Sequence, residues 1–282
     1  MQIKITESQF KNLKYSCRTQ GLIDCACNLN ENNQFEVDSD EISLDSFYPK
    51  DTLAENIWDG DKLNSRVRLT LLDIADDFID FLKIDWVEYK DIVLTGSICN
   101  YNWSNYSDID VHIIYDFSEI DDNVDLIRSY VDSKKNEWVA NHDDLAIYGF
   151  KVELYVENAL DKSAVSNGVY SLEKNEWIRK PSKNDIKLHS NSKIKDLSAD
   201  IMTMIDDIEL CYEKAEIDSD LETLDKQLEE ICEMIKDLRK VELEKHGEMA
   251  VGNIVYKILR REGYLDKLYE LRNSIYDEIN SI

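Results

Sequence analysis

Proline and glycine are scarce in this chain of 282 residues, which has two prolines and eight glycines. Proline breaks helices and central strands, and because none follows Pro181, the rest of the chain is free to form long helices. No glycine-rich Walker loop is present, which excludes the phosphate cradle that this loop builds.

Long apolar runs are also absent. No run approaches the roughly 18 residues that a membrane span requires. The first ten residues, MQIKITESQF, lack the apolar core of a secretory signal. We therefore expect a cytoplasmic protein that does not enter a membrane. Six scattered cysteines agree with a reducing compartment.

The cysteines give little support for a metal site. Cys17, Cys25 and Cys27 form the densest group in the sequence. They lack the Cys-x-x-Cys pairing and the fourth ligand of a structural zinc site, so zinc is not favoured there.

Basic residues are few: 33 lysines and arginines stand against 59 aspartates and glutamates, and the formal net charge is −26. A surface this acidic repels polyanions. Long nucleic acid is therefore disfavoured as a partner, although a local basic patch could override the average. The composition indicates no oligomeric state.

Residues 92–113 carry the strongest functional pattern in the chain. A short apolar run ends in Gly96-Ser97, and after ten further residues come Asp108 and Asp110, separated and followed by aliphatic residues. Residues two apart on a strand share one face and lie about 6.5 Å apart. The two aspartates therefore point to one side, and the aliphatic residues point to the other, which suits a core.

This arrangement favours a divalent cation and a phosphate. Two close carboxylates repel each other unless a cation lies between them. Magnesium prefers oxygen ligands and often takes carboxylates together with substrate phosphates. Gly96 would let the backbone approach a ligand, and the Ser97 hydroxyl and nearby N–H groups would hold phosphate oxygens. An isolated Asp-x-Asp on an acidic surface is the alternative, and the Gly-Ser spacing argues against it.

A two-metal site usually needs a third carboxylate, and the next strand-like run supplies the candidates. Residues 151–157 alternate, with Glu153, Tyr155 and Glu157 on one face and aliphatic residues on the other. Residues 121–140 precede this strand and have the apolar spacing of a helix. We predict Glu153 as the third acid because aliphatic residues flank it on both sides. Glu157 is the reserve, and a surface salt bridge is the alternative for either.

The Gly-Ser strand followed by Asp-apolar-Asp-apolar resembles the signature of the nucleotidyltransferase superfamily, whose fold is shared with DNA polymerase β. The resemblance implies a nucleoside triphosphate substrate and two magnesium ions held by Asp108, Asp110 and Glu153. It also implies that Gly96 and Ser97 contact the phosphates, and that the third acid comes from a neighbouring strand after an intervening helix. Residues 59–82 look like the segment that precedes this motif in predicted nucleotidyltransferases of some large bacteriophages.

The chain departs from the family in two places. Its third acid is a glutamate, where aspartate is commoner. The loop of residues 98–107 lacks the arginine and glycine of many relatives and is rich in asparagine and aromatic residues. These side chains could stack on a base or pack the loop onto the protein. His112 shares the face of the acids and is either a substrate contact or proton acceptor, or a histidine hydrogen-bonded to a carboxylate.

Basic and aromatic residues also gather in residues 168–181. Arg179 and Lys180 are the candidates for contacts to a triphosphate, because charge-assisted hydrogen bonds to phosphate are strong. A strand with solvated basic side chains is an equally good interpretation.

We predict an α+β protein with a nucleotidyltransferase-type mixed sheet, flanking helices and a C-terminal helical domain. Its expected parts are an N-terminal accessory element (residues 1–55), a core (56–185) and the helical domain (186–282), in which apolar stripes indicate an antiparallel hairpin. Helices are also expected over residues 62–83, 248–262 and 264–280.

The expected activity is transfer of a nucleoside monophosphate to a small molecule or protein, with release of pyrophosphate; synthesis of a cyclic nucleotide is a further option. One alternative is a nucleotide-binding or interaction module without catalysis. Another is a phage or host interaction protein that uses the helical hairpin as its contact surface.

Overall fold

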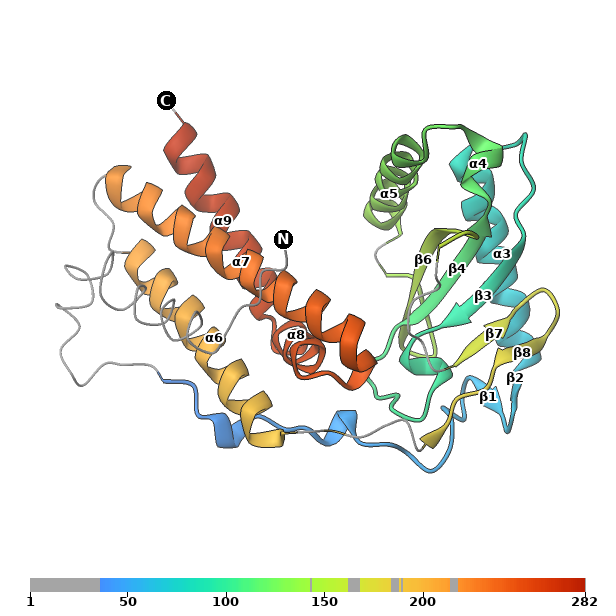
Figure 1. The fold of residues 1–282 in the computed structure, drawn as a ribbon, viewed down its shortest axis with the longest axis horizontal. Coiled ribbons are helices and arrows are strands. Elements are labelled where there is room, and N and C mark those ends of the chain that lie inside the picture. Colours follow the sequence, from blue (N-terminus) through green and yellow to red (C-terminus); the bar gives the residue numbers. More distant parts are fainter. Residues whose placement is uncertain are drawn as a thin grey trace. The chain divides into compact units, whose positions relative to one another are not determined.

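The strands around the two aspartates lie in the middle of a six-stranded mixed sheet in the computed structural model (Figure 1). The structure describes residues 36–142, 144–161, 168–183, 188, 190–213 and 218–281. Two units are present: the sheet unit, Asp45–Lys187, and the helical unit, which combines Met1–Leu44 with Leu188–Ile282. The mixed sheet with its helices confirms the α+β class.

The sheet surrounds one parallel strand pair with antiparallel neighbours. In spatial order its strands are β5 (Ala146–Ile147), β6 (Phe150–Asn158), β4 (Ile109–Tyr115), β3 (Asp91–Thr95), β7 (Val169–Ser171) and β8 (Glu176–Arg179). β4 and β6 are parallel, and β3 runs antiparallel to both β4 and β7. A parallel pair needs a long crossover, and α4 (Phe117–Ile120) and α5 (Val124–Asn141) supply it. The helix expected over residues 121–140 is thus confirmed as α5.

The helix before the Gly-Ser strand, α3 (Ser65–Leu82), also agrees with the prediction, although it begins three residues later than the apolar spacing suggests. The reason is a small antiparallel pair, β1 (Trp58–Asp59) with β2 (Lys62–Leu63), which takes up the first residues. The Asn64 side chain then caps the helix by accepting a 2.9 Å hydrogen bond from the Arg66 N–H.

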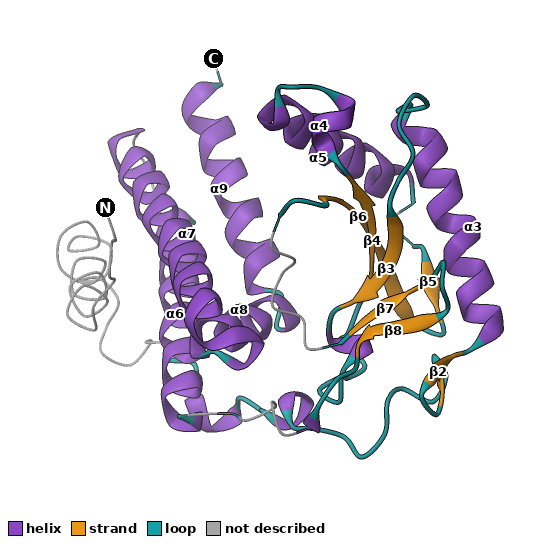
Figure 2. Cartoon of the chain, turned by 45° about the vertical axis from the view of Figure 1, so that its right-hand side comes forward, coloured by secondary structure: helices purple, strands orange, loops and turns teal. Residues whose placement is uncertain are grey.

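One face of the sheet forms the core with α3 and α5. Ile109, Val111 and Ile113 are fully buried on this face. α3 packs against β4 and α5 and lies alongside the strands (Figure 2), and α5 packs against β6. Phe78 of α3 meets Trp138 of α5 edge to face, with ring centroids 5.3 Å apart. Because strand residues alternate, this burial fixes the polar residues between them on the opposite face.

The helical unit contains α6 (Asn191–Tyr212), α7 (Asp218–His246), α8 (Val251–Arg261) and α9 (Tyr264–Asn280). α6 and α7 run antiparallel and pack on each other, and α8 and α9 pack on both (Figure 1). Their apolar stripes are therefore covered by α8 and α9 as well as by each other. Gly263, at φ +79°, separates α8 from α9 where the sequence predicts a break.

The segment expected as one N-terminal element divides between the units. Residues 36–44, with a short 3-10 helix η2 (Ser39–Glu41), belong to the helical unit, where the Val37 N–H donates to Thr203 Oγ1 at 3.1 Å. Residues 45–55 belong to the sheet unit, where the Lys50 N–H donates to the Tyr101 carbonyl. Residues 1–35, and with them the candidate zinc cysteines 17, 25 and 27, lie outside the described residues.

The described cysteines, Cys99, Cys211 and Cys232, are buried thiols. Within the described parts of the chain, no helix has the length and apolarity that crossing a membrane requires.

Candidate functional site

The Gly-Ser turn lies directly against the second aspartate. Thr95, the last residue of β3, is opposite Asp110 on β4. Gly96 follows at φ +77° and ψ −167°, a conformation that is essentially restricted to glycine. A Cβ added to Gly96 would lie 1.9 Å from Asp110 Oδ2. The sequence predicts that Gly96 lets the backbone approach a ligand. In the structure, the absence of a Cβ at Gly96 also makes room for the Asp110 carboxylate.

The predicted third acid lies beside the second one. β4 and β6 pair in parallel with Asp110 opposite Glu153, so their Cα atoms are separated by about one strand spacing of 4.8 Å. Asp108 precedes β4 by one residue and shares their face by alternation. All three side chains are partly exposed, while the residues between them are buried. The backbone thus places Asp108, Asp110 and Glu153 on one face of two neighbouring strands. The alternation predicts the shared face, and the resemblance predicts that the strands are neighbours.

The reserve acid is engaged elsewhere. Glu157 Oε2 lies 3.0 Å from His112 Nδ1, and the His112 ring stacks on Tyr155 with centroids 4.7 Å apart. Of the two interpretations of His112, the structure shows the hydrogen bond to a carboxylate. Because Glu157 pairs with His112, Glu153 is the better candidate for a ligand.

Tyr155 and Lys135 also lie at the site, and the sequence did not identify them as functional candidates. The Tyr155 hydroxyl donates a short hydrogen bond to Glu153 Oε2. Burial raises the pKa of Tyr155, and the neighbouring Glu153 carboxylate raises it further. Lys135 of α5 places its Nζ 3.4 Å from the centroid of the Tyr155 ring. Tyr155 could have been found by its alternation with Glu153. Lys135 carries no such signal, because Lys134 beside it looks identical in sequence.

The loop of residues 98–107 is mostly packed onto the protein, the second of its two interpretations. Asn100 is fully buried, and the Trp103 indole N–H donates to the Thr52 carbonyl at 2.8 Å. Ser97 Oγ donates to Ser107 Oγ at 2.8 Å, which ties the loop's two ends together. Tyr106 differs from these residues, because 62% of its surface is exposed.

The predicted basic residues lie at the far edge of the sheet. Arg179, the last residue of β8, is opposite Val169 of β7. Strands β3 and β7 separate β8 from β4, a distance of about 14 Å at the usual strand spacing. The Lys180 ammonium pairs with Asp61 Oδ2 at 2.8 Å, and both side chains are exposed. A phosphate contact by either residue therefore remains a prediction.

The chemistry of the acids fits a divalent cation, although their side chains do not converge on one point. Carboxylate oxygens are the ligands that magnesium prefers. In the described part of the chain, however, no three acidic, histidine or cysteine side chains are close enough to hold a metal ion. Glu153 is turned toward the Tyr155 hydroxyl. Because Asp110 and Glu153 are opposite each other on neighbouring strands, rotation of the Glu153 side chain alone would bring its carboxylate toward Asp110.

Mn²⁺ can serve as a paramagnetic substitute for Mg²⁺ in a binding measurement. We expect Glu153→Gln to weaken Mn²⁺ binding by at least about tenfold, because it removes a predicted charged ligand. Glu157→Gln is the matched control: it removes the same charge four residues further along β6, from a side chain that contacts His112. Its Mn²⁺ affinity should change by less than about threefold if Glu153, and not Glu157, is the third ligand. Titration with Mn²⁺, read by the electron paramagnetic resonance of the free ion, measures both. A larger loss in Glu157→Gln would exchange the roles of the two glutamates.

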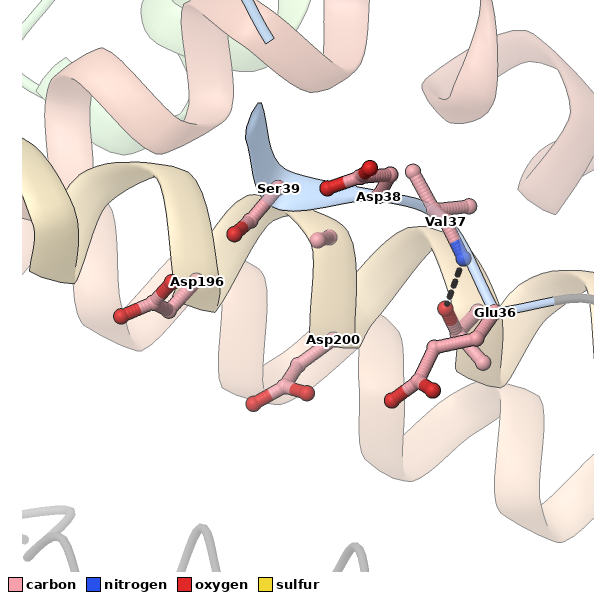
Figure 3. A pocket seen from close by; sticks show the side chains of 8 residues that line it. Glu36, Val37, Asp38, Ser39, Asp196 and Asp200 are labelled. Carbon is pink, nitrogen blue, oxygen red and sulfur yellow. Dashed lines mark hydrogen bonds between the residues drawn. The ribbon is translucent and has the colours of Figure 1, made fainter. Parts of the chain in front are cut away.

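A separate cavity of about 520 Å³ lies in the helical unit between residues 36–39 and α6 (Figure 3). Glu36, Asp38, Asp196 and Asp200 line it, and none of the described lining residues is basic. Four carboxylates repel a triphosphate. The cavity also lies in the other unit from the Gly-Ser turn, so it is not part of the candidate site on the sheet.

Comparison with known proteins assigns no family to the chain. No protein-family model matches it, and no curated protein is significantly similar. Among solved structures it is similar to a STING-associated CdnE c-di-GMP synthase from Capnocytophaga granulosa, with 13% identity over 98% of this chain and 100% of that chain and a TM-score of 0.23. A TM-score this low does not establish a shared fold.

Proposed function

We propose that the chain is a magnesium-dependent nucleotidyltransferase that moves a nucleoside monophosphate from a nucleoside triphosphate to an acceptor. The observation that carries this proposal is the register of β4 with β6. It sets Asp110 beside Glu153, with Asp108 on the same face. The strand ending in Gly96 and Ser97 lies next to this group. Three carboxylates beside a Gly-Ser turn suit the binding of a metal–triphosphate complex.

In this proposal Asp108, Asp110 and Glu153 would hold two magnesium ions, which would supply positive charge to offset that of the phosphates and of the attacking and leaving oxygens. The backbone N–H groups at Gly96 and Ser97 bind the β- and γ-phosphates. The Ser97 hydroxyl, which donates to Ser107, turns toward a phosphate oxygen. Arg179 and Lys180 are additional candidate phosphate contacts.

The transfer itself is an in-line displacement. An acceptor oxygen attacks the α-phosphorus, the bond from that phosphorus to the oxygen bridging to the β-phosphate breaks, and pyrophosphate leaves. One carboxylate of the group accepts the proton of the attacking hydroxyl. Orientation of the reactants by the two strands supplies much of the acceleration.

The acceptor is a small molecule or a protein side chain. A net charge of −26 opposes the approach of a polyanion. A compact hydroxyl compound or a protein does not meet this repulsion to the same degree. Composition and fold favour neither one over the other.

Calorimetry with ATP, GTP, CTP and UTP, each with and without magnesium, tests the proposal. We expect at least one triphosphate to bind only in the presence of magnesium, because the carboxylates repel a bare triphosphate. The variant Asp108→Asn/Asp110→Asn should lose this binding.

Two other results would contradict the proposal. Magnesium-independent binding that survives in the double variant would indicate a nucleotide-binding module without this catalytic site. No binding of any triphosphate, by a protein whose thermal unfolding is cooperative, would indicate an interaction protein.

A further inference from the structure

Lys135 is a basic side chain at the acidic face of the sheet. It belongs to α5, which packs against β6. Its ammonium lies over the ring of Tyr155, 3.4 Å from the ring centroid, and the hydroxyl of that ring donates to Glu153. The Tyr155 side chain therefore connects Lys135 with Glu153, the predicted third acid.

The preceding lysine has a different environment. Lys134 lies over the Phe81 ring at 4.6 Å and pairs with Glu137 at 2.9 Å, so its charge is neutralised on its own helix. Lys135, in contrast, forms no ion pair within 4.0 Å among the described residues. Its positive charge is available to the carboxylates of the sheet.

The carboxylates and this lysine act on each other. Burial lowers the pKa of Lys135, and the charges of Glu153 and Asp110 oppose that effect. Electrostatic interaction is mutual, so the ammonium stabilises the two carboxylates as much as they stabilise it. A positive charge at this place also repels any cation that the carboxylates bind.

We propose that Lys135 is a positioning residue that gives the carboxylate group a fixed counter-charge and thereby limits its affinity for a free divalent cation. The proposal rests on the nucleotidyltransferase function and deepens it. A bound triphosphate supplies negative charge that offsets the lysine. The cation then binds well only together with the triphosphate, and the site discriminates against a cation that arrives alone.

The size of the effect follows from Coulomb's law. Even with the screening of bulk water, a unit positive charge several ångströms from a doubly charged cation changes cation affinity by about five- to tenfold. Salt screens the interaction, so the difference should decrease between low and high ionic strength.

The test is Mn²⁺ binding without nucleotide, read from the free-ion resonance, for the wild-type protein and for Lys135→Met. We expect Lys135→Met to bind Mn²⁺ about five- to tenfold more tightly. Lys134→Met and Lys135→Arg should bind like the wild type, because the first removes a neutralised charge and the second keeps the charge. A gain in affinity that Asp110→Asn abolishes is specific to this site and excludes non-specific binding by a misfolded protein.

A second readout adds inorganic triphosphate, which carries the phosphate charge without a base. Triphosphate should strengthen Mn²⁺ binding more in the wild type than in Lys135→Met. Suppose that Mn²⁺ binding by the wild type requires Asp110 but that Lys135→Met binds Mn²⁺ no more tightly than the wild type. That result would overturn the role of Lys135 and leave the proposed function standing. Mn²⁺ binding that is absent, or that Asp110→Asn leaves unaffected, would overturn both this role and the proposed function.

Discussion

Replacing Asp110 with asparagine is expected to lower pyrophosphate release by roughly a thousandfold or more. Asp110 is the central acid of the group, because it is opposite Thr95 of β3 on one side and Glu153 of β6 on the other. Asparagine keeps the shape but removes the charge that holds a cation. A thousandfold loss corresponds to about 4 kcal/mol of transition-state stabilisation.

The same change should leave the fold intact. Removing one of three neighbouring negative charges reduces repulsion, so the midpoint of thermal unfolding should stay the same or rise. Pyrophosphate release can be followed with whichever triphosphate binds, with water as the default acceptor. Retained activity in Asp110→Asn would contradict the assignment of Asp110 as a ligand of the catalytic cation.

Asp116→Asn is the control for Asp110→Asn. Asp116 follows the other end of β4 and caps α4 by accepting a hydrogen bond from the Ser118 N–H at 3.0 Å. Asparagine caps a helix nearly as well as aspartate. The control thus removes one negative charge near the same strand and should preserve activity.

Gly96→Ala is expected to reduce the free energy of unfolding by about 2–4 kcal/mol and to abolish cation binding. The backbone conformation of Gly96 costs a residue with a Cβ about 1–3 kcal/mol. The new methyl group would also lie 1.9 Å from Asp110 Oδ2, so the carboxylate must move. Chemical denaturation measures the first effect, and Mn²⁺ titration measures the second.

Gly149→Ala separates the two causes. Gly149 also has a positive φ, +86°, but a Cβ there would meet no atom within 4 Å. It should therefore lose stability through the backbone alone and keep its affinity for Mn²⁺. A double-mutant cycle with Asp110→Ala completes the test, because removal of the carboxylate should reduce the cost of Gly96→Ala. Equal costs in both backgrounds would show that the contact with Asp110 is unimportant.

The central strands and helices could be predicted because their apolar periodicity is a local signal. β4 and β6 alternate, so the sequence alone assigns Asp110 and Glu153 to faces opposite the core. Their position side by side was a prediction about strand order, which followed from the resemblance rather than from the alternation. The boundary of α3 was less predictable, because the pairing of β1 with β2 competes with helix formation.

The remainder of the site depends on contacts between segments distant in sequence. Lys135 is 20 residues from Tyr155, and nothing in the helical pattern distinguishes it from Lys134. The packed state of residues 98–107 likewise depends on the Thr52 carbonyl, which accepts from Trp103. The division of residues 36–55 between two units has no local signal, because its partners lie far along the chain.

That division has a consequence for the order of folding. The sheet unit is one continuous stretch of chain, so it can fold as soon as synthesis has passed Lys187. Residues 36–44 are made earlier but find their partners only later: Val37 bonds to Thr203, 166 positions away, and the Ser43 carbonyl accepts from Arg261, 218 positions away. Closing loops of this length costs entropy and slows folding. The helical unit should therefore complete its structure last, after the sheet unit has formed.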